Sequence, residues 1–133
     1  MGMKEIVVVT KNRPGLLADI SETLADRGIN IETIAGEEVH GTAVIQLTVD
    51  RYNDALQSLR DAGIDAVTED ALVIRLPDEP GALARVARRF KEANIDLHSL
   101  RIIRRMEGVT FVALCADRSE EARELVKEYL VTG

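Results

Sequence analysis

The residues best suited to bind a small polar ligand surround two Pro-Gly pairs, Pro14-Gly15 and Pro80-Gly81. Each pair follows a short apolar run typical of a strand and precedes a segment with the apolar spacing of a helix. A helix that begins at such a junction offers unpaired backbone N–H groups and a partial positive charge, which attract a carboxylate. Glycine has no Cβ, so a small ligand can approach the backbone closely. Both junctions are therefore candidate sites for a ligand that carries a carboxylate.

Polar side chains at matching positions accompany the two pairs. Asn12 precedes the first pair by two residues, and Asn30 stands near the start of the apolar segment after the helix. A carboxamide can both donate and accept hydrogen bonds. Asp78 and Asp96 occupy the corresponding positions in the second copy. Alternatively, a Pro-Gly pair can simply form a turn before a helix, with Asn as an ordinary turn residue. Because the pair occurs at the same position in both copies, we favour a role in binding.

The two pairs belong to a longer repeat, in which residues 13–34 match residues 79–100 at a constant offset of 66. A fixed period of this size indicates one supersecondary unit built twice. Pro14 is expected at the first helical position, because it has no N–H to leave unpaired there. In the first copy the pattern predicts strands at 6–9, 29–34, 42–49 and 64–67, and helices at 14–28 and 52–62. This β-α-β-β-α-β order is that of the α+β ferredoxin-like unit.

The second copy repeats this order but lacks a clear fourth strand. Its predicted strands lie at 72–76, 95–103 and 109–116, and its helices at 83–93 and 119–130. We therefore expect residues 72–76 to lie at a sheet edge that another chain completes, unless truncation has removed the missing strand. The predicted organisation is one module at residues 1–70 and a second at 71–133, packed side by side.

The third strands of the two copies differ on the face turned away from the helices. By the alternation of strand side chains, that face carries Thr42 and Gln46 in the first copy, and Phe111 and Cys115 in the second. An apolar open face favours contact with another protein. We predict a homodimer, and a poorly covered surface of small residues is the alternative.

The first copy resembles the ACT domain. The resemblance rests on Asn12-Arg13-Pro14-Gly15, on the apolar helix residues that follow, and on Gly28-Ile29-Asn30-Ile31. Together with the second copy it covers nearly the whole chain as two tandem modules. ACT domains are regulatory modules that pair and bind amino acids or similar small effectors at the interface between copies. The resemblance implies the same activity here.

The resemblance also implies sites that draw a loop from one copy and a strand from the other. One site would combine Asn12, Gly15 and Leu16 with Asp96, and the other Asp78, Gly81 and Ala82 with Asn30. An Asp in place of Asn attracts an ammonium group but repels a carboxylate, so the two sites are expected to differ in affinity or occupancy. The candidate ligand-binding residues are Asn12, Arg13, Pro14, Gly15, Leu16, Asn30, Ile31, Asp78, Pro80, Gly81, Ala82 and Asp96.

These features predict an amino-acid-binding regulatory protein that signals through an enzyme or regulator partner in trans, or through a change of assembly. Leu16 and Ala82 limit the space beside the glycines, which favours a small or branched aliphatic ligand. A regulatory subunit that binds other proteins but no small molecule is the alternative. No metal and no cofactor is expected.

Catalysis and nucleic-acid binding fit the sequence less well. An acylphosphatase-like enzyme shares the predicted fold, but its phosphate-cradling loop uses a backbone donor that Pro14 lacks. The spacing of His40 and His98 indicates no triad or metal site, and Cys115 is expected to be a small strand residue. RNA-recognition modules stack bases on strand aromatics, whereas this chain has two Phe residues and a net charge of −6. We expect neither enzyme activity nor a nucleic-acid partner.

The chain also lacks the marks of a membrane or secreted protein. No apolar run approaches the roughly 18–20 residues of a membrane helix. The N-terminal sequence has no signal-peptide character, and a single cysteine cannot form an internal disulfide. A cytoplasmic protein with no membrane partner is the expectation.

Overall fold

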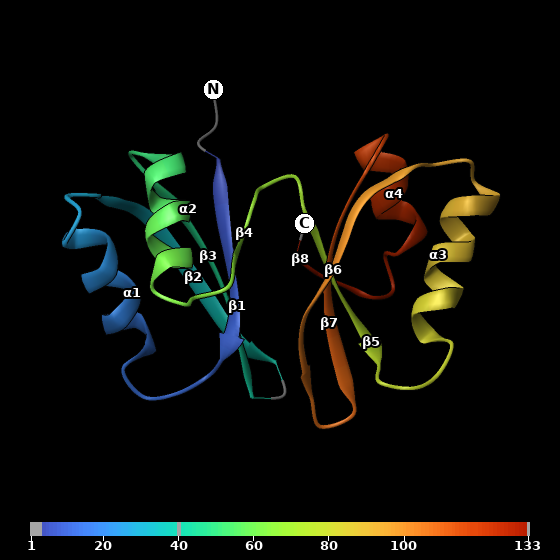
Figure 1. Cartoon of the computed structure of the whole chain (residues 1–133), viewed down its shortest axis with the longest axis horizontal. Coiled ribbons are helices and arrows are strands. Elements are labelled where there is room, and N and C mark those ends of the chain that lie inside the picture. Colours follow the sequence, from blue (N-terminus) through green and yellow to red (C-terminus); the bar gives the residue numbers. More distant parts are fainter. Residues whose placement is uncertain (1–3, 40, 133) are drawn as a thin grey trace. The chain divides into compact units, whose positions relative to one another are not determined.

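The computed structural model describes residues 4–39 and 41–132 of the 133-residue chain. The chain divides into two compact units, Met1–Glu69 and Asp70–Gly133, here named module 1 and module 2. Each module has its own four-stranded sheet (Figure 1). Each also has its own cluster of buried hydrophobic residues. Each therefore contains the parts of a complete small α+β fold.

Module 1 has the predicted β-α-β-β-α-β order. Its strands are β1 (Glu5–Lys11), β2 (Ile31–Val39), β3 (Thr42–Val49) and β4 (Ala66–Val67), and its helices are α1 (Leu16–Ala25) and α2 (Tyr52–Asp61). The strands lie in the sheet order β2-β3-β1-β4, and every neighbouring pair is antiparallel. This is the ferredoxin-like arrangement that the sequence predicts.

Module 2 repeats the same fold. Its strands are β5 (Leu72–Pro77), β6 (Leu97–Met106), β7 (Val109–Ala116) and β8 (Leu130–Thr132), and its helices are α3 (Ala82–Glu92) and α4 (Ser119–Leu125). The antiparallel sheet has the order β6-β7-β5-β8, which corresponds to that of module 1 strand by strand. The duplication of sequence is thus a duplication of structure.

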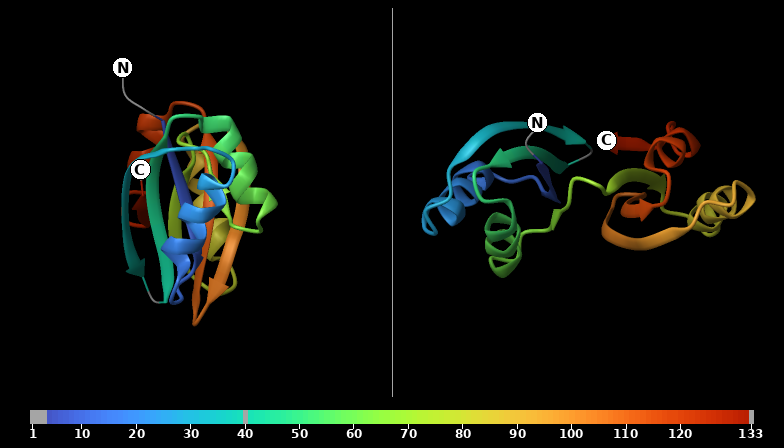
Figure 2. Two further views of the ribbon diagram at one scale, coloured as in Figure 1. Left: turned by 90° about the vertical axis from the view of Figure 1, so that its left-hand side faces the viewer. Right: turned by 90° about the horizontal axis from the view of Figure 1, so that it is seen from above.

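The helices of each module cover one face of its sheet (Figure 2). In β3 the alternating residues Ala43, Ile45, Leu47 and Val49 are buried in the core of module 1, as predicted. Ile20 of α1 packs in the same core. Within the described part of the chain, no helix is long and apolar enough to span a membrane.

The prediction that module 2 lacks a fourth strand is wrong. Strand β8 pairs with β5 through Val73 opposite Thr132 and Ile74 opposite Leu130. The expected helix over 119–130 ends at Leu125, which frees the following residues to turn back toward the sheet. A three-residue strand is too short to produce an alternating pattern, so periodicity cannot predict it.

Arg89 of α3 holds the turn between α4 and β8. Its guanidinium donates to the Leu125 carbonyl at 2.8 Å and to both carboxylate oxygens of Glu128 at 2.6 and 3.0 Å. It also lies 5.1 Å from the ring centre of Tyr129. The hydrogen bond from Arg89 lowers the pKa of Glu128, and the same bond raises the pKa of Arg89. One side chain therefore fixes both the end of α4 and the approach to β8.

Each Pro-Gly pair occupies the centre of a type II turn. Gly15 has φ 83° and ψ 1°, and Gly81 has φ 87° and ψ −10°. The Leu16 N–H donates to the Arg13 carbonyl at 3.3 Å, and an equivalent bond closes the second turn. Pro suits the second position of this turn, and Gly suits the third because that position requires positive φ. The prediction that Pro14 begins the helix is therefore wrong, since α1 begins after the turn.

Candidate functional site

Module 1 contains an open cavity of about 440 Å³ at its Pro-Gly turn. The cavity lies between this turn, the first turn of α1 and the second half of β2, with β3 beneath. Its lining residues are Asn12, Arg13, Gly15, Leu16, Leu17, Ala18, Ile34, Ala35, Gly36, Glu37, Glu38, Ala43 and Ile45. Four of the predicted site residues, Asn12, Arg13, Gly15 and Leu16, therefore line one cavity.

The polar end of the cavity is formed by Asn12 and Glu38. The Asn12 side-chain amide donates to one carboxylate oxygen of Glu38 at 2.8 Å. The backbone N–H of Asn12 donates to the Gly41 carbonyl at 2.9 Å, which holds Asn12 beside the end of the β2–β3 hairpin. The side-chain carbonyl oxygen of Asn12 and the second carboxylate oxygen of Glu38 are further acceptors, and both can bind a cationic group.

The first turn of α1 adds a site for negative charge. No side chain caps the helix at Gly15, and backbone N–H groups in a first helical turn have no intrahelical partner. Arg13 forms an ion pair with Asp19, so both side chains are held close to this turn. A carboxylate next to Leu16 or Leu17 would meet the positive end of the helix.

The other side of the cavity is apolar. Leu17 and Ile34 expose 55% and 43% of their surface, which is high for large aliphatic side chains. Gly36 of β2 provides much of the open space, since a Cβ at this position would lie 3.2 Å from Cγ1 of Ile45. The φ angle of Gly36 is not positive, so the absence of a side chain, and not an unusual backbone, distinguishes this residue.

Module 2 has a much smaller cavity, of about 60 Å³, at the equivalent turn. Strand pairing identifies the corresponding residues: Gly36 lies opposite Ile45 in module 1, and Ile102 lies opposite Val112 in module 2. Ile102 lines the small cavity, so its side chain takes up space that Gly36 leaves open. The second Pro-Gly turn is therefore present without a comparable cavity.

The polar pair is also different in module 2. By strand pairing, Arg105 takes the place of Glu38, and Asp78 replaces Asn12. The Asp78 carboxylate lies 3.7 Å from Nε of Arg105 and forms an exposed ion pair with it. The strand residue that carries negative charge in module 1 thus carries positive charge in module 2.

Three predicted site residues, Asn30, Ile31 and Asp96, lie far from the Pro-Gly turns, whereas Asp78 and Ala82 line the small cavity of module 2. Asn30 pairs with Asp50 at the other end of β3, through bonds of 3.0 and 3.2 Å. The eight residues of β3 separate it from Asn12 by about 24 Å, so module 1 by itself does not bring the two carboxamides together. Ile31 packs against the core, and Asp96 lies at the corresponding far end of module 2. The pairing of Asn12 with Asp96, and of Asp78 with Asn30, stays a prediction.

Sequence reasoning missed the contribution of β2 to the cavity. Five consecutive residues of this strand, Ile34 to Glu38, line the cavity. The predicted strand ends at residue 34, whereas β2 continues to Val39. Glycine and glutamate are depleted in strands, so residues 36–38 carry no strand signal in the sequence.

The sequence model of the ACT domain family matches residues 4–57 and 71–131. Similar solved structures include a protein from Bacteroides thetaiotaomicron, 22% identical, with a TM-score of 0.49 over 97% of this chain and 91% of that chain. The ligand-free regulatory subunit of aspartate kinase from Thermus thermophilus is 19% identical, with a TM-score of 0.45 over 95% and 91%. The acetolactate synthase small subunit from Thermotoga maritima is 14% identical, with a TM-score of 0.42 over 99% and 91%. No curated protein sequence matches the chain.

Proposed function

The chain belongs to the ACT domain family, and we propose that it is a non-catalytic regulatory protein that binds one free amino acid in the cavity of module 1. The observation that carries this proposal is the contrast between two equivalent turns, of which one adjoins about 440 Å³ of open space and the other about 60 Å³. Small-molecule sites usually occupy about 300–1,000 Å³. Of these two cavities, the one in module 1 has a volume in that range and the one in module 2 does not.

The groups around the cavity match those of an α-amino acid. The Glu38 carboxylate and the Asn12 carbonyl are suited to an ammonium group, and the uncapped start of α1 is suited to a carboxylate. Leu17 and Ile34 provide an apolar surface for the side chain of the ligand. This combination favours an amino acid with a small or branched aliphatic side chain.

Regulation requires that the ligand distinguish between two states of the protein. A ligand with equal affinity for both states shifts nothing, however tightly it binds. We propose that binding favours one arrangement of the modules or one complex with an enzyme or regulator in the cytoplasm. The predicted homodimer, and the completion of each site by a strand of another module, are part of this proposal.

A thermal-shift screen against the twenty amino acids tests the proposal. A ligand at about 100 times its Kd stabilises the folded state by roughly 2.7 kcal/mol, which raises Tm by several degrees. We expect a response to one or a few aliphatic amino acids and a stoichiometry of one per chain by titration calorimetry. A flat screen would instead favour a subunit that binds only other proteins.

Asn12→Ala is the appropriate first variant for confirming the site. It removes the hydrogen bond to Glu38 but leaves the turn intact, because Asn12 is exposed and precedes the turn. Gly15→Val is less suitable, since φ of 83° strains any side chain and lowers stability in addition to binding. Unchanged affinity in Asn12→Ala would count against this cavity as the site.

A further inference from the structure

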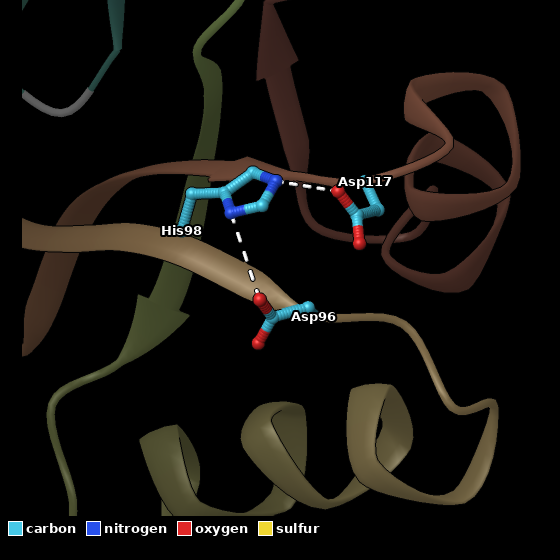
Figure 3. A group of neighbouring side chains, drawn as sticks. All are labelled: Asp96, His98 and Asp117. Carbon is cyan, nitrogen blue, oxygen red and sulfur yellow. Dashed lines mark hydrogen bonds and ion pairs between the residues drawn. The ribbon is translucent and has the colours of Figure 1, made fainter.

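In module 2, His98 lies between two carboxylates, those of Asp96 and Asp117 (Figure 3). Its Nε2 lies 2.5 Å from Oδ1 of Asp117, and its Nδ1 lies 3.6 Å from Oδ2 of Asp96. One ring nitrogen and one oxygen from each carboxylate lie within 4.8 Å of one another. Each of the three side chains is at least half exposed to solvent.

The backbone fixes this arrangement. The Asp117 N–H donates to the Asp96 carbonyl at 3.0 Å, so the two aspartates lie opposite each other where β6 begins and β7 ends. The register of β6 then shifts between Leu97 and Ser99, which makes His98 the extra residue of a β-bulge. Bulges redirect side chains and are frequent beside functional sites.

Module 1 has the same bulge but a different set of side chains. The register shift there lies between Ile31 and Thr33, so that Glu32 is the extra residue. Asp50 accepts the backbone N–H of Asn30 at 3.0 Å and is thereby engaged locally. The shared backbone feature belongs to the fold, whereas the His and two Asp side chains belong to module 2 alone among the described residues.

The cluster in module 2 is short of positive charge. A neutral imidazole has one N–H, so it can donate to one carboxylate, while its other nitrogen presents a lone pair to the second. Arg118 follows Asp117 in the sequence, but its guanidinium donates to the Asn94 carbonyl at 2.7 Å and lies 3.2 Å from a carboxylate oxygen of Glu121. A cation bound between the three side chains would satisfy both carboxylates.

We propose that Asp96, His98 and Asp117 bind a divalent first-row transition metal ion such as zinc. One imidazole nitrogen and two carboxylate oxygens form a donor set that these ions accept, at bond lengths of about 2.0–2.2 Å. Small rotations of exposed side chains bring the three donors to such distances from one point. With three protein ligands, water completes the coordination. Asp96 also belongs to the predicted completion of the module 1 site, but metal binding is measured without an amino acid and through His98 and Asp117, which that site does not use.

Titration of the purified, tag-free, chelator-treated chain with Co²⁺ tests the proposal. Co²⁺ has coordination preferences close to those of Zn²⁺, and its visible absorption reports inner-sphere ligands. We expect saturation at one Co²⁺ per chain and displacement of the signal by Zn²⁺. His98→Gln and Asp117→Asn should each weaken binding by roughly 10- to 100-fold or more, since even outer-shell substitutions have effects of that size.

Matched substitutions exclude other donors. His40→Gln removes the second histidine of the chain, Cys115→Ser removes the thiol, and Glu32→Gln alters the equivalent bulge in module 1. All three should leave the Co²⁺ affinity unchanged. Circular dichroism checks that His98→Gln is folded, which is expected for an exposed side chain. No saturable Co²⁺ binding by the native chain, or equal binding by folded His98→Gln and the native chain, would overturn the proposal.

Discussion

The Pro-Gly turns of the two modules have the same backbone but different surroundings. Both are type II turns closed by a bond of the same length, 3.3 Å, and both precede a helix without a side-chain cap. Module 1 places Gly36 and Glu38 opposite its turn, whereas module 2 places Ile102 and Arg105 there. The comparison teaches that the Pro-Gly motif specifies the turn, while the facing strand determines how much open space lies beside it.

The largest expected effect comes from exchanging the residues that open and fill the cavities. Gly36→Ile should fill the cavity of module 1 and lower amino-acid affinity roughly 100-fold, or about 2.7 kcal/mol. Titration calorimetry with the best amino acid measures the change. The matched variant Ile102→Gly should leave affinity and stoichiometry unchanged, because Arg105 still lies at the polar end of the second cavity. Native affinity in a folded Gly36→Ile variant would contradict the proposed site.

A second exchange concerns the polar pair. Asn12→Asp removes the donor to Glu38 and places two carboxylates about 3 Å apart, so amino-acid affinity should fall roughly tenfold. The double variant Asn12→Asp/Glu38→Arg recreates the charge pattern of module 2. It should recover the Tm lost by the single variant but bind no amino acid. If the double variant binds as well as the native chain, the charge at position 38 is irrelevant to recognition.

The fourth strands provide a comparison of stability. Arg89 secures the approach to β8 through four hydrogen bonds to three residues, whereas Arg60 secures β4 through two contacts to the Ala66 carbonyl, at 3.2 and 3.3 Å. Arg89→Gln should lower the free energy of unfolding by about 1 kcal/mol, and Arg60→Gln by less. Urea denaturation monitored by circular dichroism measures both. Equal effects would show that Arg89 contributes no more than its counterpart.

The smallest expected effect is a pH dependence confined to module 2. Because Arg89 lowers the pKa of Glu128 in the folded state, the stabilisation is complete above the ordinary value of 4.5. It is lost as the pH falls from 4.5 through the lowered pKa. Glu128→Gln should therefore reduce the loss of Tm over that pH interval. Arg89→Gln removes the group that lowers the pKa of Glu128, so it should change the profile in the same direction as Glu128→Gln.

The sequence predicts most of the fold because most strands are marked by apolar alternation or by apolar runs. The bounds of β3 and β7 agree with the prediction residue for residue, since apolar side chains alternate in β3 and form an almost continuous run in β7. β8 was not predicted, because a strand of three residues is too short to show an alternation of apolar and polar side chains. Its position depends on Arg89, which lies far away in the chain.

The candidate site could be predicted only in part. Asn12 and Gly15 were identifiable because a local motif carries them, and both line the cavity. Gly36 and Glu38 were not identifiable, because their position depends on how β2 pairs with β3. The contact between His98 and Asp117 was likewise not identifiable, since strand pairing and not sequence spacing brings these residues together.

The shortness of β4 has a consequence for how module 1 opens. Only Val7 and Val8 of β1 pair with β4, whereas seven residues of β1 pair with β3. In hydrogen-exchange experiments, amides of β1 that point toward β3 should exchange only when module 1 unfolds as a whole. Those that point toward β4 should exchange through a smaller local opening. The amides on the two sides of β1 are therefore expected to exchange at different rates, slowly on the side of β3 and faster on the side of β4.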